Sequence, residues 1–204
     1  MRSILLLVII GVILIFTGCS DLTKEEVVEK AQDKIDNIKT YQCRVEVEIF
    51  GNRGSQIYEI SQSYKEGSFR LETLSPKHLE GKIVIIEENR AKIHHPNIEQ
   101  SITIENFIQN REESMFLGDF LAWNFQEVLE VREITHQGKD YFILSKEMDQ
   151  GSFYHHTQCL WLEKKSIEPK YVKIYDDKGN LRIEISIFDL EINKNIDDGL
   201  FILD

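Results

Sequence analysis

Apolar and polar residues follow two different periods along this chain. One amphipathic helix is predicted between residues 23 and 39, where apolar positions recur every three or four residues. Its apolar stripe consists of Val27, Ala31, Ile35 and Ile38. Thr23 and Glu26 at its start match a capping box, in which each side chain accepts a hydrogen bond from the other residue's backbone N–H. After the helix the period changes to two, which is typical of half-buried strands.

The alternating segments predict about eleven strands joined by short turns. They cover residues 41–49, 56–65, 69–74, 82–88, 90–95, 101–104, 128–135, 141–147, 154–162, 170–175 and 181–190, with a further short edge near Phe201. Successive hairpins make the sheet antiparallel, and a sheet of so many strands curls or splits rather than staying flat. The expected fold class is mainly β (α+β): a strongly curved antiparallel sheet, a half-open barrel, wrapped around two or more helices.

A second helix is predicted from about Glu113 to Phe125. It carries a broad apolar surface formed by Met115, Phe116, Leu117, Phe120, Leu121 and Trp123. Such a surface needs cover on more than one side. Two interpretations stay open: the helix plugs the concave face of the sheet, or it forms a lid over an acyl-chain cavity or part of a protein interface.

The first nineteen residues have the pattern of an exported protein. Arg2 precedes an apolar run, residues 4–16, that is shorter than the roughly 20 residues needed to cross a bilayer and is typical of a signal peptide. The run ends in Phe16-Thr17-Gly18-Cys19, which resembles the lipobox of bacterial lipoproteins. The resemblance implies that residues 1–18 are removed and that the sulfur of Cys19 carries a diacylglycerol. A cleaved signal with a chance cysteine is the alternative. Residues 19–204 form a single expected domain.

The charge of the chain limits its partners. The formal net charge is −11, and removing Arg2 with the signal peptide makes it −12. Because so acidic a body repels phosphates and anionic headgroups, no nucleic-acid partner is expected. Attachment to a membrane would therefore depend on the two acyl chains of the lipid, which together anchor a protein stably.

No motif in the sequence predicts catalysis. Neither a Gly-x-Ser-x-Gly elbow, a phosphate-binding glycine loop nor a His-Glu-x-x-His helix occurs. The histidine pairs 94–95 and 155–156 point to opposite faces of predicted strands, so that each pair offers at most one metal ligand per face. Cys43 and Cys159 either form a disulfide or are two separate buried thiols. We expect no metal, no cofactor and no enzymatic activity.

Several segments resemble lipoprotein carriers of the LolA and LolB type. Ser75-Pro76, residues 79–85 and His95-Pro96-Asn97 are similar to their proline- and glycine-initiated hairpin. Residues 160–169 resemble their strand–turn signature, and residues 188–201 resemble their terminal strand. The resemblance implies a half-open barrel around helices, with an interior of the kind that holds acyl chains.

The lipobox, Thr40-Tyr41-Gln42-Cys43 and residues 114–121 together resemble the GerS-type germination lipoproteins of spore-forming clostridia. That resemblance implies a non-catalytic, extracytoplasmic lipoprotein required for spore germination. The implied partner is a cell-wall N-acetylmuramoyl-L-alanine amidase of the CwlD type, which takes part in forming muramic-δ-lactam. The alternative function is a membrane-fixed acyl-chain binding protein of the LolA/LolB type. Exposed sheet edges would also allow a homodimer by strand exchange.

Overall fold

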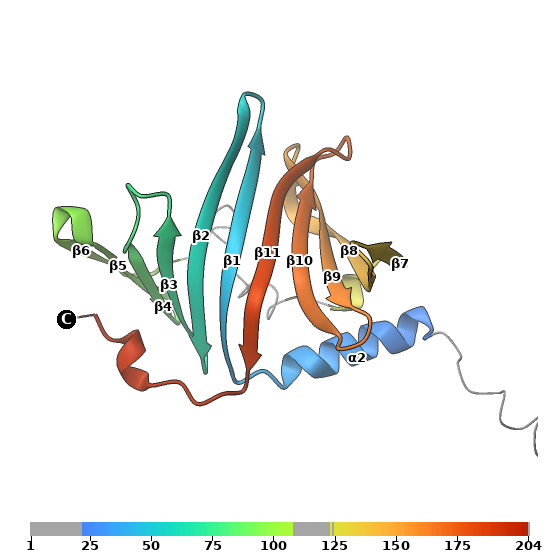
Figure 1. Ribbon diagram of the computed structural model, residues 1–204, viewed down its shortest axis with the longest axis horizontal. Helices are drawn as coiled ribbons and strands as arrows, with labels where there is room; N and C mark the ends of the chain where they lie inside the picture. Colours follow the sequence, from blue (N-terminus) through green and yellow to red (C-terminus); the bar gives the residue numbers. More distant parts are fainter. Residues whose placement is uncertain (1–21, 108–122, 124, 204) are drawn as a thin grey trace, which may run out of the picture.

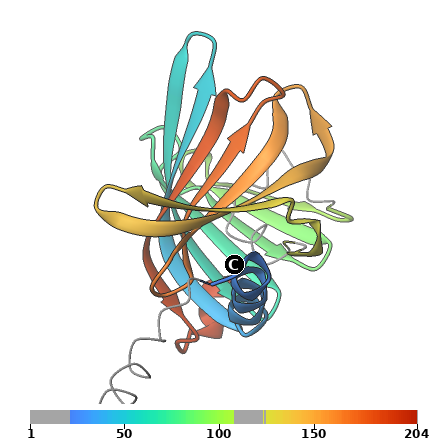
Figure 2. The same ribbon diagram turned by 90° about the vertical axis from the view of Figure 1, so that its right-hand side faces the viewer.

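The computed structural model describes residues 22–107, 123 and 125–203, and they form one strongly curved antiparallel sheet (Figures 1 and 2). Eleven strands follow the spatial order β6-β5-β4-β3-β2-β1-β11-β10-β9-β8-β7. Their bounds are β1 Thr40–Gly51, β2 Gly54–Lys65, β3 Ser68–Ser75, β4 Ile83–Glu87, β5 Arg90–His95, β6 Gln100–Ile104, β7 Glu130–His136, β8 Lys139–Ser152, β9 His155–Glu163, β10 Glu168–Tyr175 and β11 Leu181–Ile192. The predicted fold class, mainly β with a curved antiparallel sheet, is confirmed.

The first and last strands meet in the middle of the sheet. β1 pairs along its whole length with β2, and on its other side with β11. The sheet therefore has an N-terminal half, β1 to β6, and a C-terminal half, β7 to β11, and the chain crosses between the two outer edges after β6. This central pairing joins the two halves into one sheet.

The helix α2, Lys24–Asp36, packs against the face that the sheet curves around (Figure 2). The predicted capping box is confirmed: Thr23 Oγ1 accepts from the Glu26 N–H at 3.2 Å, and Glu26 Oε2 accepts from the Thr23 N–H at 2.7 Å. The stripe Val27, Ala31 and Ile35 is buried against strands of both halves. Apolar burial thus places the helix on the concave face, as the sequence pattern predicts.

The predicted short strand near Phe201 is wrong. Residues Asp198–Phe201 form a 3₁₀ turn, η4, whose start is capped by Asp197. The backbone carbonyls of the terminal segment accept hydrogen bonds from side chains of the N-terminal half: Lys65 to Ile196, Arg70 to Leu200 and Lys92 to Leu203. Since these carbonyls already have partners, the segment runs along the sheet without joining its ladder.

Candidate binding site on the concave face

An apolar cavity of about 300 Å³ lies on the concave face of the N-terminal half. Its walls come from successive strands, β1 to β5, and include Val47, Ile60, Leu71, Ile86, Ala91 and Ile93. Phe107 closes one side, and Lys82 is a charged residue of the lining. A volume of this size is at the lower end of what small-molecule sites have, so the site suits a slender apolar ligand or a protruding side chain.

The loop between β3 and β4 forms part of the cavity wall, because Leu79 and Lys82 belong to the lining. This loop packs against the turn after β5: Asn97 Nδ2 donates to the His78 carbonyl at 3.2 Å. Gly81 has a φ of +77°, and a Cβ at this position would lie 2.9 Å from Pro96. The segments whose sequence suggested a carrier-type hairpin are therefore neighbours in the structure, and a glycine is required at their contact.

Trp123 is the one residue of the proposed apolar helix surface that lies within the described residues, and it does not line this cavity. Its ring is buried in the main core, in edge-to-face contact with Phe125. Its Nε1 donates to Gln158 Oε1 at 2.6 Å, and the Lys146 ammonium lies 5.5 Å from the ring centroid. Trp123 thus contacts side chains of strands β8 and β9. Residues Phe125–Glu127 form a 3₁₀ turn, η3.

The other residues of that predicted surface lie outside the described residues: Met115, Phe116, Leu117, Phe120 and Leu121. The helix that was predicted to carry them stays a prediction. Cys19 and the predicted signal peptide also lie outside the described residues. Among the described helices, none is long and apolar enough to cross a membrane.

Cys43 and Cys159 are free thiols in the structure and lie on opposite faces of the sheet. Cys43 faces the main core, where burial raises the pKa of its thiol to about 12. Cys159 faces the outer side, beside Tyr141 and Trp161, and burial raises its pKa as well. Of the two alternatives, the structure thus has two separate thiols, both held in the unreactive protonated form.

Histidine and carboxylate side chains do not gather into a metal site in the part of the chain that the structure describes. His94 Nδ1 instead lies 3.0 Å from Ser101 Oγ, and His156 Nδ1 lies 3.2 Å from Thr157 Oγ1. His136 packs against Tyr141, Trp161 and Tyr171 on the outer face of the sheet. Each of these three histidines thus has a local hydrogen-bond or ring contact.

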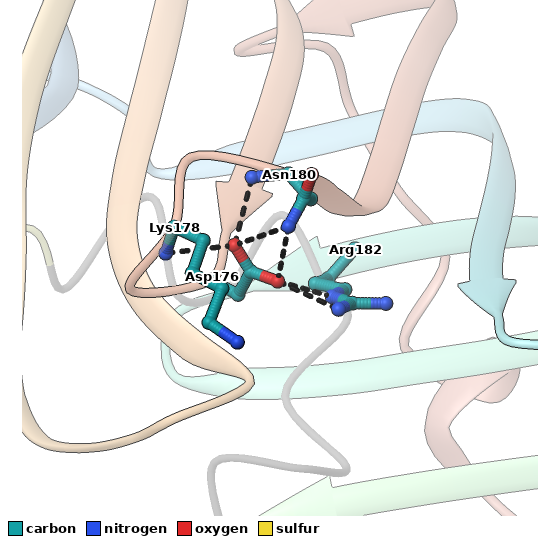
Figure 3. Close-up of polar contacts among 4 residues, drawn as sticks. All are labelled: Asp176, Lys178, Asn180 and Arg182. Carbon is teal, nitrogen blue, oxygen red and sulfur yellow. Dashed lines mark hydrogen bonds and ion pairs between the residues drawn. The ribbon is translucent and has the colours of Figure 1, made fainter.

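Asp176, at the turn between β10 and β11, is the buried ionised group that sequence reasoning missed (Figure 3). Its oxygens accept from the backbone N–H groups of Lys178 and Asn180, from Asn180 Nδ2, and from the Arg182 guanidinium at 2.6 Å. These donors, Asn180 first, hold the pKa of the Asp176 carboxyl well below its usual range. The residues Asp-Asp-Lys-Gly-Asn between the two strands are typical of a turn, and an aspartate that begins a turn often accepts from the backbone N–H two residues on. The arrangement closes a hairpin.

Solved structures of other proteins share the fold of this chain. An uncharacterized conserved protein from Thermus thermophilus superposes with a TM-score of 0.60 at 13% identity, covering 89% of this chain and 95% of that chain. A putative outer membrane lipoprotein-sorting protein domain from Vibrio parahaemolyticus superposes with a TM-score of 0.50 at 16% identity, covering 86% and 94%. These likenesses establish a LolA-like fold.

A family model identifies the family, and one curated relative is similar over most of the chain. The model of the family described as "Sporulation protein YdcC-like" matches residues 1–201. The chain therefore belongs to the YdcC-like family of sporulation proteins. Sporulation protein YdcC of Bacillus subtilis (strain 168) is 22% identical over 199 residues, which are 97% of this chain and 59% of that relative. The chain thus spans under two thirds of the length of that relative.

The structure of the CwlD amidase from Clostridioides difficile in complex with the GerS lipoprotein also contains a matching chain. The match is to GerS, at 26% identity and a TM-score of 0.51, and it covers 87% of this chain and 100% of that chain. The resemblance of the sequence to GerS-type proteins with a LolA-like fold is confirmed.

Proposed function

We propose that this protein is a non-catalytic, lipid-anchored partner of a cell-wall amidase and acts outside the cytoplasm during sporulation or germination. The observation that carries the proposal is the match to GerS in its complex with CwlD, which spans the whole of the GerS chain. Membership of a sporulation family supports the same setting. The partner of this chain would be an N-acetylmuramoyl-L-alanine amidase that prepares the cortex for muramic-δ-lactam formation.

The surroundings of the ionisable groups agree with a binding role. The pKa of Asp176 is depressed because its carboxylate accepts hydrogen bonds within a turn. The pKa values of Cys43 and Cys159 are raised because both thiols are packed in apolar clusters. Catalytic groups are usually displaced in pKa where a cleft holds a substrate, and none of these three lines the apolar cavity. Each displaced pKa in this set has a structural cause.

The lipid anchor would hold the described domain close to the membrane. Four residues separate Cys19 from α2's first residue, Lys24, and the five Cα steps between them span at most about 17–18 Å. The anchor itself supplies the attachment that a formal charge of −12 would not. A partner enzyme bound to this protein would therefore be concentrated at the membrane surface.

The test of this proposal combines a binding and a cell-wall measurement. The lipid-free chain, residues 20–204, is mixed with the CwlD-type amidase of the same genome and binding is measured by calorimetry. Cortex from a strain lacking this gene is analysed for muramic-δ-lactam, and a strain lacking the amidase serves as control. Binding together with loss of the lactam supports the proposal. Absence of binding together with normal lactam content refutes it.

A second candidate function rests on the cavity. Its volume of about 300 Å³ and its aliphatic lining suit one acyl chain, with Lys82 as a charged member of the wall. In this alternative the protein is a membrane-fixed acceptor of lipid or lipoprotein acyl chains. A fluorescent C16 fatty acid titrated into the lipid-free chain tests it: saturable binding supports the alternative, and no binding removes it.

A further inference from the structure

The two edges of the sheet differ in how they are protected against pairing with another strand. β7, at one edge, carries three charged residues, Glu130, Arg132 and Glu133, and α2 contacts it; Lys24 of this helix donates to the Leu129 carbonyl just before the strand. Charged side chains and covering elements are the usual means by which sheet edges avoid association. The edge formed by β7 therefore has the features of a protected edge.

Among the residues that the structure describes, β6 at the other edge has none of these protections. Its sequence, Gln100-Ser101-Ile102-Thr103-Ile104, contains no charge, and all five residues are exposed. Within residues 22–107, 123 and 125–203, β6 pairs with β5 alone, so that its outer row of backbone N–H and C=O groups has no strand beside it. An uncharged and exposed edge of this kind is a template for an added strand.

The concave side of β6 continues the apolar surface of the cavity. Ile102 and Ile104 pair with Ile93 and Ala91 of β5, which are cavity residues. Ile102 is 57% exposed and Ile104 is 38% exposed. Apolar surface thus extends from the cavity to the exposed side chains of Ile102 and Ile104 at the edge of the described sheet. A strand added beside β6 would place every second side chain against this surface, so those side chains should be apolar.

The charges at the two ends of β6 argue against a second copy of this chain as the occupant. In an antiparallel pair of β6 strands centred on Ile102, Glu99 of each copy would lie opposite Glu105 of the other. Like charges opposite each other destabilise a strand pair, and the net charge of −11 on each copy adds to the repulsion. The same two glutamates attract a strand whose ends are basic.

We propose that β6 is the docking edge for an extended segment of a partner protein, with alternating apolar and polar residues flanked by basic ones. As far as the partner is the amidase, the inference rests on the proposed function. Main-chain hydrogen bonds to β6 would supply affinity, while Ile102 and Ile104 would select apolar side chains on one face of the added strand. Glu99 and Glu105 would fix its ends.

The first test compares matched substitutions at the two edges. I102K places a charge on β6, and I134K places the same charge on β7, where Ile134 is 40% exposed. We expect I102K to weaken binding of the amidase roughly tenfold or more and I134K to change it less than about twofold. Equal effects of the two variants would overturn the proposal. Circular dichroism and thermal unfolding of each variant show that the fold is retained.

Three further measurements identify what occupies the edge. On binding of the amidase, the amide hydrogens of residues 100–104 should exchange more slowly, and unchanged exchange there would overturn the proposal. Reversing both flanking charges, E99K with E105K, should weaken binding of a basic segment severalfold. Sedimentation that shows a dimer of the unmutated chain, lost in I102K, would name a second copy as the occupant and overturn the proposal of a different partner.

A synthetic peptide separates this inference from the proposed function. The peptide Lys-Val-Thr-Val-Thr-Val-Lys has the chemistry inferred for the added strand and does not depend on the amidase. Perturbed NMR resonances at residues 100–104 in the unmutated chain, absent in I102K, would support the docking edge even if the amidase does not bind. Unperturbed resonances would overturn it. If the amidase fails to bind while the peptide binds, the proposed function fails alone.

Discussion

Replacement of Trp123 by phenylalanine tests whether this residue belongs to the core or to a functional surface. The Trp123 Nε1–H donates to Gln158 Oε1 at 2.6 Å, and both side chains are buried. W123F leaves the side-chain oxygen of Gln158, Oε1, without this donor, which lowers the unfolding free energy by about 1–3 kcal/mol. It also weakens the contact of the Lys146 ammonium with the ring, which contributes about 0.5–1 kcal/mol. The expected loss in unfolding free energy is about 2–3 kcal/mol.

The measurement is equilibrium urea unfolding of the lipid-free chain, with thermal unfolding as a second readout. For a chain of this size, each kcal/mol lowers the Tm by about 2–4 °C, so W123F should unfold about 4–12 °C earlier. Q158M removes the other partner, and the double variant W123F/Q158M should lose about 1–2 kcal/mol less than the sum of the single losses. Additive losses, within about 0.5 kcal/mol, would refute the assignment of this hydrogen bond as a stabilising core contact.

Four further predictions follow from the structure. Because the pKa of Asp176 is depressed in the folded chain, its contribution to stability is complete above about pH 3.8, the ordinary carboxyl value, and is lost as the pH falls below it. D176N should therefore be less stable than D177N at pH 7, and urea unfolding should show that this difference in unfolding free energy is smaller at pH 3. A difference that stays constant with pH would contradict the assignment. T23A removes the capping hydrogen bond of α2 and should lower the unfolding free energy by about 1 kcal/mol in the same assay, and an unchanged midpoint would argue against the cap. Since burial raises the pKa of both Cys43 and Cys159, a thiol reagent at pH 8 should label the lipid-free chain only after unfolding, and rapid labelling of the folded chain would show that a thiol is accessible. If the cavity binds acyl chains, T73F, which fills it, should weaken fatty-acid binding while L74F on the opposite face should not, and equal affinities would exclude the cavity as the site.

The elements of the fold follow from local patterns, which is why the sequence predicts them well. The apolar stripe and the capping box define α2 within the few residues that form it. The alternation in β1 and β2 predicts both strands and the turn between them, because each pattern is contained in a short segment. These patterns predict the elements without reference to residues far away in the sequence.

The features that sequence reasoning missed depend on contacts between distant segments. The pairing of β1 with β11 joins residues that are far apart in sequence, from Tyr41 with Ile192 to Ile49 with Ile183, and neither strand's sequence indicates its partner. The terminal segment near Phe201 has a short apolar run that suits a strand, but side chains of β2, β3 and β5 bind its carbonyls. The cavity likewise exists only once five strands are placed side by side.

The candidate site was predicted only in part for the same reason. The sequence predicts Trp123 on an apolar helix surface that either packs in the core or serves a cavity or interface. Its ring lies in the main core, where it donates to Gln158 of a distant strand, a contact that no local pattern indicates. The exposed apolar residues of β6 were assigned to an ordinary strand, because exposure at an edge depends on the order of strands in the sheet. The sequence alone does not give that order.

Binding of the lipid-free chain to the CwlD-type amidase of the same genome is the most direct test of the central claim. Calorimetry should show saturable binding with a Kd below about 10 µM, and the amide hydrogens of β6 should become protected in the complex. No heat of binding at this concentration, together with a normal muramic-δ-lactam content in a strain lacking the gene, would contradict the claim that this protein acts by binding the enzyme.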